Sequence, residues 1–385
     1  MKVLYVLSGT DLYGGSTKAF YNLFKEVKLK GVEPLVFCTQ KNGIYNILKE
    51  EGVSVEASDF RFTSWPGYRG GDLLFFVPRL LFRIYLHTVA YYKLLQFAKI
   101  NKPDIIHSNV SVIDIGYLVA RKLHIRHIWH VREYGLLDFN IHVAPSYSIF
   151  KKRLNDKINH SICITKGIQI YHGLSDINST VIYDGVMSQK MIRYNPVKGN
   201  YFLFVGRLEK TKGADVCIDA FKKLVDEQGT ESELRIAGAP IKDEYLDYLK
   251  SQAKGYRISF LGARKDVYDL MYNAKALIVP SKNEGFGFIT AEAMFNGCLV
   301  IGRNTSGTKE QMDNGLEKTG NEIALRFETE AELVMRMKEV DNLNSAVFRE
   351  MVMRGLAVAS DLYSTEKHAA RVASLYKRIV DETEK

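Results

Sequence analysis

The chain is poor in cysteine, with four in 385 residues and no C-x-x-C pair. These cysteines are scattered in apolar surroundings, which favours reduced core thiols of a cytosolic protein over a zinc site or a disulfide framework. The first apolar stretch is too short for a secretory leader and has no cleavage site. No compact run of Lys and Arg alternates with aromatic residues, so no nucleic-acid partner is expected.

What is present fits a large globular protein. A length of 385 residues is too great for one ordinary domain and fits two, and 46% hydrophobic content supports a real core. The net charge of +9 makes acidic partners plausible, among them nucleotide diphosphates and anionic lipid.

Short apolar runs alternate with helical patterns through both halves of the chain, which predicts an α/β fold with two Rossmann-like domains. A polar segment with Pro196 and Gly199 divides the halves and is typical of a linker. We expect a first domain at 1–186, a linker at 187–200, a second domain at 201–362 and a terminal helix within 363–385. The strands are predicted near 3–7, 32–37, 53–55, 103–109, 127–134, 161–165, 180–183, 201–205, 234–237, 258–262, 274–279 and 299–301, and helix is predicted over 326–358.

Residues 280–308 hold the densest pattern, PSKNEGFGFITAEAMFNGCLVIGRNTSGT. A strand ends at Pro280, and Glu284 then precedes a glycine-rich turn where backbone can approach a ligand. A helical pattern follows, with Glu292 one to two turns inside it. The free N–H groups between the two carboxylates suit an anionic ligand, so this stretch could hold a phosphorylated sugar.

This segment resembles the signature of the retaining glycosyltransferases of family 4, nucleotide-sugar enzymes of the GT-B fold. Their pattern is a glutamate, seven residues and a second glutamate, in a context such as PS-x-x-EGFG-x-x-x-x-EAM-x-x-G. The chain departs from it at Asn296 and Cys298, where the family usually has Ala and Pro. The residues in step with the pattern are Glu284, Gly285, Phe286, Gly287, Glu292, Ala293, Met294 and Gly297.

Further motifs resemble the donor site of the same family. Gly14, Gly15 and Ser16 resemble the glycine pair that lies against the donor diphosphate. Arg207 and Lys212 match GR-x-x-x-x-KG, and paired cations there could neutralise a diphosphate, since the chain has no D-x-D pair to hold a metal. Arg264 is a weaker candidate near the nucleotide base.

The first half resembles the family more loosely. His130 ends a predicted strand where family members have a histidine near the sugar's reacting carbon, and it is a catalytic candidate with Glu284, Arg207 and Lys212. Asn109, Arg132 and Glu133 also lie near strand ends and are candidates for binding the acceptor. Residues 184–186 (DGV) resemble the N-G-V that opens the interdomain crossover, with Asp in place of Asn.

The resemblance implies two domains facing across a cleft and a terminal helix that crosses back onto the first. It also implies transfer of a sugar from a nucleotide diphosphate, UDP favoured, with retention and without metal or other cofactor. Glu284 would hold sugar hydroxyls and Glu292 the ribose. The acceptor would be a saccharide or a lipid-linked saccharide of bacterial surface polysaccharide. Two alternatives stay open. One is a catalytically inactive partner subunit of a glycosyltransferase, and the other is a sugar phosphorylase or sugar-phosphate synthase of the same fold.

Residues 73–98 are strongly apolar, but Arg79, Arg83, His87 and Lys93 interrupt the run, so a transmembrane helix is not expected. Arg79, Arg83 and His87 recur every four residues and form one basic stripe. The helix either covers the first sheet with this stripe in solvent or rests the stripe on an anionic membrane surface. Residues 59–71, rich in Gly, Arg and aromatics, are predicted to be a loop, and the family resemblance implies that this region faces the acceptor.

Overall fold

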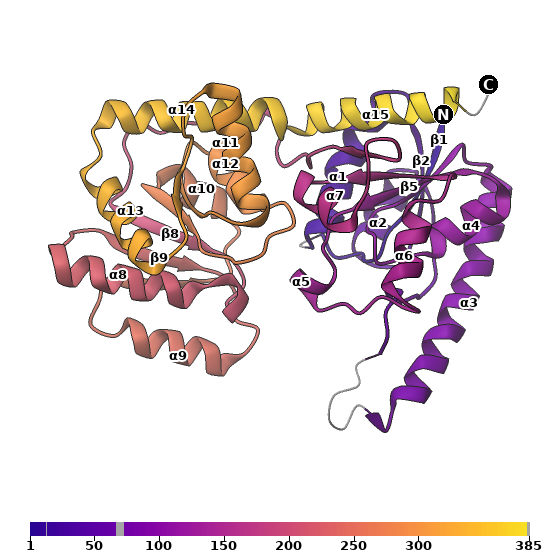
Figure 1. Ribbon diagram of the computed structural model, residues 1–385, viewed down its shortest axis with the longest axis horizontal. Coiled ribbons are helices and arrows are strands. Elements are labelled where there is room, and N and C mark those ends of the chain that lie inside the picture. Colours follow the sequence, from indigo (N-terminus) through magenta and orange to yellow (C-terminus); the bar gives the residue numbers. More distant parts are fainter. Residues whose placement is uncertain (13, 67–72, 383–385) are drawn as a thin grey trace. The chain divides into compact units, whose positions relative to one another are not determined.

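A computed structural model describes residues 1–12, 14–66 and 73–382. The chain divides into two compact units, residues 1–185 with 365–385 and residues 186–364 (Figure 1). Residues 67–71 of the loop predicted to face the acceptor lie outside the described residues.

The first unit is built on a sheet of seven parallel strands in the order β3-β2-β1-β4-β5-β6-β7. Residues of these strands are buried on both faces, as parallel strands covered by helices must be. The strands are β1 (Lys2–Val6), β2 (Glu33–Cys38), β3 (Ser54–Ala57), β4 (Ile105–Ser108), β5 (Arg126–Val131), β6 (Asn159–Cys163) and β7 (Ser179–Val181).

Helices cover both faces of this sheet. Helices α1 (Gly15–Lys28), α2 (Ile44–Glu50) and α15 (Thr365–Asp381) share one hydrophobic core with it, and α1 packs against α15. Helices α3 (Phe76–Asn101) and α4 (Ile115–Leu123) share the core on the other face. The short helices α5 (Leu136–Phe139), α6 (Tyr147–Leu154) and α7 (Lys166–His172) follow β5 and β6 along the chain.

The second unit has a parallel sheet of six strands in the order β10-β9-β8-β11-β12-β13. Its strands are β8 (Tyr201–Val205), β9 (Glu233–Ala237), β10 (Ile258–Gly262), β11 (Ala276–Val279), β12 (Leu299–Arg303) and β13 (Leu325–Phe327). Its helices are α8 (Ala214–Gln228), α9 (Asp243–Ala253), α10 (Val267–Asn273), α11 (Phe288–Phe295), α12 (Ser306–Thr319), α13 (Glu330–Asn342) and α14 (Ser345–Leu362), with 3-10 turns η2 (Gln189–Met191) and η3 (Lys210–Lys212).

The α/β class and the two Rossmann-like sheets confirm the predicted fold. Helix over 326–358 was wrong in part, because β13 ends inside that range and a break after Asn342 separates α13 from α14. Residues 187–200, predicted as a linker, fold with the second unit. There Arg193 donates to Asn296 Oδ1 at 2.6 Å, and Lys198 Nζ donates to the carbonyl oxygens of Tyr272 and Gly297 at 2.7 Å.

Helix α3 covers the sheet with its second half alone, since its buried residues begin at Ala90. The basic stripe predicted to face solvent or membrane is divided in the structure, because Arg79 is exposed while Arg83 and His87 are not. Arg83 donates to the carbonyl oxygen of Ser64 at 2.8 Å, and His87 Nε2 lies 2.9 Å from Asp114 Oδ1, so both side chains turn toward the unit. Among the described helices, none has the length and apolar character needed to cross a membrane.

Gly307 fixes the distance between α12 and the loop that precedes α11. Its N–H donates to the carbonyl oxygen of Glu284 at 2.9 Å. A Cβ at this position would lie 2.6 Å from the carbonyl carbon of Phe286 and 2.8 Å from its Cα, which are backbone atoms that cannot rotate away. The glycine therefore allows the loop to approach the first turn of α12.

We predict that Gly307→Ala lowers the free energy of unfolding by about 1–3 kcal/mol, as overpacking typically does. The matched control is Gly355→Ala, within α14 of the same unit, where the nearest atom to a new Cβ is 3.5 Å away. That control should be stabilised by up to about 1 kcal/mol because alanine favours helix over glycine. Chemical denaturation measures both, and equal effects would contradict the prediction.

Candidate active site

The loop between β11 and α11 is the centre of the candidate donor site in the second unit. Gly287 has φ 86°, a left-handed conformation that favours glycine, and it begins α11 as its N-cap. Gln311 Nε2 donates to the carbonyl oxygens of Phe286 and Gly287 at 2.6 and 3.0 Å, which holds the turn. The Phe286 side chain is buried and packs edge-on against Phe288 and Tyr363.

The structure brings two predicted site residues together. Lys212 Nζ donates to Glu284 Oε1 at 2.6 Å, although 72 residues separate them in the chain. Lys212 ends the turn η3 after β8, and Glu284 follows β11, so the neighbouring carboxyl ends of two parallel strands place them side by side. Both side chains keep part of their surface exposed, 26% for the lysine and 18% for the glutamate, and so remain reachable from solvent.

The other donor candidates of this unit contact residues outside the Lys212–Glu284 pair. Tyr268 on α10 donates to Glu292 Oε1 at 3.1 Å, and Glu292 is largely buried. Arg207 pairs with Glu209 at 2.9 Å and is more than half exposed. Arg264 pairs with Asp266 at the surface. Gly285 lies in the same loop as Glu284, and no hydrogen bond joins Arg207 or Arg264 to that loop in the described contacts.

A buried polar network lies at the carboxyl ends of β4 and β5 in the first unit. Arg132 forms an ion pair with Asp184, and both side chains are buried. Its Nε donates to the carbonyl oxygen of Asn109 at 2.9 Å, and its Nη2 donates to Asn109 Oδ1 at 3.2 Å. Asn109 in turn donates to the carbonyl oxygen of Ser16 at 2.9 Å. The aspartate that replaces the expected asparagine therefore balances a buried guanidinium.

His130 belongs to this network and has no exposed surface. Arg132 Nη2 donates to His130 Nδ1 at 3.2 Å, so that nitrogen carries a lone pair and the neutral ring bears its proton on Nε2. His107 Nε2 also lies 3.2 Å from His130 Nδ1, and His107 Nδ1 lies 2.5 Å from the hydroxyl of Tyr376 on α15. Burial and the charge of Arg132 lower the pKa of His130 well below its ordinary value, so the ring is neutral.

His130, Asp184 and His368 form a buried group with the residue types of a metal site. The hydrogen bonds do not fit a cation, however. The N–H of Gly185 donates to His368 Nδ1 at 2.8 Å, so the His368 proton also lies on Nε2, and a protonated nitrogen is no metal ligand. The Arg132 guanidinium already neutralises Asp184. The Nε2 atoms of these two histidines therefore fit hydrogen-bond donors better than metal ligands.

Glu133 is buried against the loop after β4. Its Oε1 accepts from the N–H and hydroxyl of Ser111 at 2.7 and 2.8 Å and from the N–H of Val112 at 3.1 Å. Burial raises the pKa of Glu133 to about 7 from its ordinary value of 4.5. Asn109, Arg132 and Glu133 thus all serve the internal structure here, and their acceptor role stays a prediction.

Gly14 and Gly15 lie where the sequence placed them, between the first strand and α1. Gly14 is the N-cap of α1, and Gly15 and Ser16 form its first turn. Sequence reasoning missed three residues that support the candidate sites, namely Tyr268, His368 and Tyr376. Tyr268 lies in a helix without a distinguishing motif. His368 and Tyr376 lie on α15, far along the chain from their hydrogen-bond partners Gly185 and His107.

Comparison with known proteins finds similar glycosyltransferases. Residues 189–340 match the family model "Glycosyl transferases group 1". An uncharacterised glycosyltransferase of Methanocaldococcus jannaschii is 26% identical over 284 residues, which is 72% of this chain and 76% of the relative. A glycogen synthase of Mycobacterium tuberculosis is 28% identical over 60% of this chain, which spans about half of that relative, 53%.

Solved structures share the whole architecture. HepE of Anabaena in complex with UDP and glucose has a TM-score of 0.74 at 17% identity, with 98% of this chain and 99% of that chain covered. A glycosyltransferase from Rickettsia africae has a TM-score of 0.76 at 15% identity, with 98% of each chain covered. The fold is therefore GT-B. The second unit is thus similar to glycosyltransferases of group 1, and the whole chain is similar in fold to solved glycosyltransferases.

We predict that the buried carboxyl group of Glu133 makes the first unit less stable as pH rises. The folded protein keeps the proton up to about pH 7 while the unfolded chain releases it near 4.5, so stability falls across that window. Glu133→Gln stays neutral and keeps a carbonyl acceptor, so its stability should gain on that of the parent by up to about 3 kcal/mol between pH 4.5 and 7.

Urea denaturation at several pH values measures this difference. Glu33→Gln, which removes an exposed carboxylate paired with Lys2, is the control and should run parallel to the parent. A Glu133→Gln curve that also runs parallel to the parent would refute the assignment.

Proposed function

We propose that this chain is a retaining glycosyltransferase that moves a sugar from a nucleotide diphosphate, UDP favoured, to a saccharide acceptor. The acceptor is a growing or lipid-linked saccharide in bacterial surface polysaccharide synthesis. The observation that carries the proposal is the contact between Lys212 and Glu284 at the carboxyl ends of two strands. A donor that is anionic at one end and hydroxylated at the other needs one cation and one carboxylate side by side.

The ion pair is suited to exchange partners on binding. Its two side chains are partly exposed, so each can be satisfied by solvent or ligand when the other leaves. The ammonium group would bind the diphosphate, because charge-assisted hydrogen bonds to phosphate are strong. The released carboxylate would then accept hydrogen bonds from sugar hydroxyls. One contact in the free enzyme thus holds both groups ready.

The backbone around Gly287 would supply the remaining donors. The first N–H groups of α11 have no partner within the helix, and the positive end of the helix dipole favours the charge that develops on a leaving diphosphate. Gly285 has no side chain and is partly exposed, so a ligand could approach the backbone before the helix. Arg207, which is more than half exposed, would add a second cation, so the charge is neutralised without a metal or other cofactor.

The reaction itself breaks the bond between the anomeric carbon and the diphosphate oxygen. The acceptor oxygen forms the new bond on the same face and loses its proton, and the products are the nucleotide diphosphate and the extended saccharide. No protein nucleophile is assigned. His130 stays a catalytic candidate through the position that it shares with the family histidine, and its Nε2–H would donate a hydrogen bond rather than take a proton.

The known ligands of the structural relatives support the choice of donor. HepE of Anabaena was crystallised with UDP, with UDP and glucose, and with UDP-glucose. Lipopolysaccharide enzymes are also among the structural relatives, including the outer core galactosyltransferase WaaB with a TM-score of 0.66. These proteins motivate a UDP-linked donor and an acceptor of cell-surface type.

We predict that Lys212→Ala weakens UDP binding about ten- to a hundredfold, since a charge-assisted hydrogen bond contributes roughly 1.5–3 kcal/mol. Uridine, which lacks the diphosphate, should bind both proteins equally. Lys210→Ala is the matched control, because Lys210 lies in the same 3-10 turn and pairs with Asp215 instead. Calorimetric titration measures all three. Unchanged UDP affinity in the Lys212 variant would remove this residue from the donor site.

We also predict opposite effects for the two glutamates. Glu284→Gln should reduce turnover more than UDP affinity, because Glu284 is assigned to the sugar. Glu292→Gln should weaken binding of UDP itself, because Glu292 is assigned to the ribose, and Tyr268→Phe should do so more mildly by releasing Glu292. Titration with UDP and donor hydrolysis rates separate the effects. If Glu284 controlled the affinity for bare UDP, the two roles would be exchanged.

A further inference from the structure

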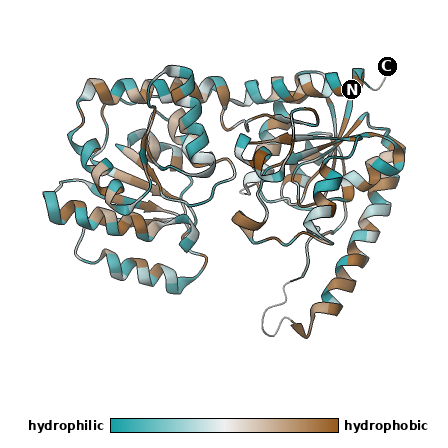
Figure 2. Cartoon of the chain, viewed as in Figure 1, coloured by the Kyte–Doolittle hydropathy of each residue, from teal (hydrophilic) through white to brown (hydrophobic). Residues whose placement is uncertain are grey.

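Helix α3 exposes an apolar face along its first half. Its members, which we call the α3 face, are Leu74, Val77, Leu81, Phe82 and Tyr85, each between 57% and 84% exposed. Leu74 precedes the first turn of the helix, and the other four, at positions 77, 81, 82 and 85, lie on one side of it at 100° per residue. Figure 2 shows this part of α3 as mostly hydrophobic, with hydrophilic bands between the hydrophobic stretches. No described residue of α3 before Ala90 is buried.

The opposite side of the same half is the one that contacts the protein. Arg83 and His87 lie there and bind Ser64 and Asp114. Asp114 also accepts from Thr63 Oγ1 at 2.8 Å and pairs with Arg153 of α6. The helix is thus fixed to the unit by polar contacts and shows its apolar side outward, which reverses the usual arrangement of an amphipathic surface helix. An outward apolar face of this kind marks an interaction site.

The surroundings of the α3 face carry positive charge. Helices α3, α4 and α6 contain no Asp or Glu within their bounds. Their exposed charged residues are all basic and include Arg79, Lys93, Arg121, Lys122 and Lys152. A surface that is apolar at one end and basic beside it fits the layers of a membrane with anionic headgroups.

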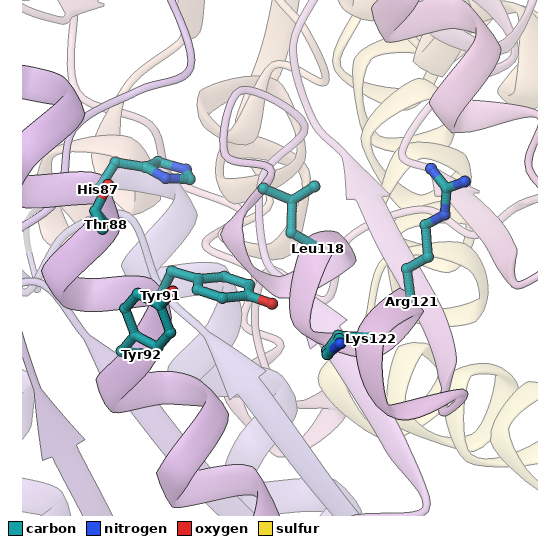
Figure 3. Close-up of a pocket in the computed structure, with 7 residues that line it drawn as sticks. All are labelled: His87, Thr88, Tyr91, Tyr92, Leu118, Arg121 and Lys122. Carbon is teal, nitrogen blue, oxygen red and sulfur yellow. The ribbon is translucent and has the colours of Figure 1, made fainter.

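A groove between α3 and α4 continues this surface. It has a volume of about 510 Å³, and its lining includes Tyr91, Tyr92, Leu118, Arg121 and Lys122 (Figure 3). Tyrosine rings are enriched at the level of lipid headgroups because one end is apolar and the other polar. Arg121 and Lys122 offer N–H donors to phosphate groups at the same level. The groove therefore fits the headgroup layer, while the α3 face fits the boundary of the acyl chains.

We infer that the α3 face and the adjoining basic groove dock this protein on an anionic membrane surface, with Leu81 and Phe82 inserted into the bilayer interface. The inference deepens the proposed function, on which it rests only for the acceptor, since a lipid-linked saccharide lies at such a surface. A second copy of the chain is a poorer occupant of this face, because two basic surroundings would repel each other.

The first test is co-sedimentation with vesicles of phosphatidylcholine containing one third phosphatidylglycerol. Leu81→Gln/Phe82→Gln removes apolar area without adding charge, at two positions that the fold does not bury. It should bind at least tenfold more weakly, because membrane binding scales with buried apolar area. Met335→Gln/Val347→Gln is the matched control, with two exposed apolar residues on helices of the second unit, and it should bind like the parent.

The second test separates charge from insertion. Arg121→Gln/Lys122→Gln should weaken binding to the anionic vesicles roughly tenfold, and the parent should lose affinity as salt is raised. With vesicles of phosphatidylcholine alone, neither the Arg121→Gln/Lys122→Gln substitution nor the increase in salt should alter binding. A parent that ignores anionic vesicles at low salt, or a Leu81→Gln/Phe82→Gln variant that binds like the parent, would overturn the inference.

Tryptophan fluorescence locates the contact. The chain has two tryptophans, of which Trp129 is fully buried and Trp65 is 36% exposed and stacked on Phe76 at the start of α3. Vesicles should shift the emission of Trp65 to the blue, and brominated acyl chains should quench it. Trp65→Phe should abolish both effects. Unchanged emission in bound protein would place the contact elsewhere and overturn the inference.

Two further measurements keep the outcomes distinct. A parent that is dimeric by sedimentation and becomes monomeric in Leu81→Gln/Phe82→Gln, without vesicle binding, would assign the face to a second copy and overturn the inference. UDP titration of the same variant without vesicles should match the parent. If neither protein binds UDP or any other nucleotide diphosphate while vesicle binding behaves as described, the proposed function fails and the docking surface stands.

Discussion

The ion pair between Arg132 and Asp184 sets the arrangement of the first unit's strand ends. Buried charges are costly unless they are paired and hydrogen-bonded, and this pair meets both conditions through Asn109 and His130. Its partners come from the ends of β4 and β5 and from the segment after β7, so one guanidinium ties three separate parts of the chain. The same guanidinium decides which nitrogen of His130 carries the proton, and thereby links a structural contact to the chemistry of the candidate site.

The candidate residues of the second unit are held in a different way. Most of its candidate residues lie on loops, and the Gln311 side chain and the Gly307 N–H fix the turn from which Glu284 projects. The Lys212–Glu284 pair is partly exposed and can open, whereas the Arg132–Asp184 pair is sealed. The first unit thus holds a buried polar network, and the second unit holds a candidate donor loop whose charged side chains stay partly exposed.

The sequence predicted the parts of this structure that are encoded locally. The apolar run at 201–205 coincides with β8, and the glutamates of the donor loop stood out through their spacing around a glycine turn. β13 escaped prediction because it is three residues long with Arg326 at its centre. The polar network could not be foreseen, since His107 and Tyr376 are 269 residues apart. The spacing of Arg79, Arg83 and His87 revealed a stripe, but only Ser64 and Asp114 determine the direction in which it points.

Helix α15 gives the chain an interleaved order, with the second unit inserted before the last element of the first. The α15 residues Ala369, Val372, Leu375, Tyr376 and Ile379 complete a core whose other buried members precede residue 183. Tyr376 also contacts His107 of β4, and His368 accepts from the N–H of Gly185 after β7. During synthesis, the core of the first unit therefore stays incomplete until the whole second unit has been made. That interval exposes apolar sheet surface to chaperones and proteases, and it makes the C-terminal segment the step that closes the fold.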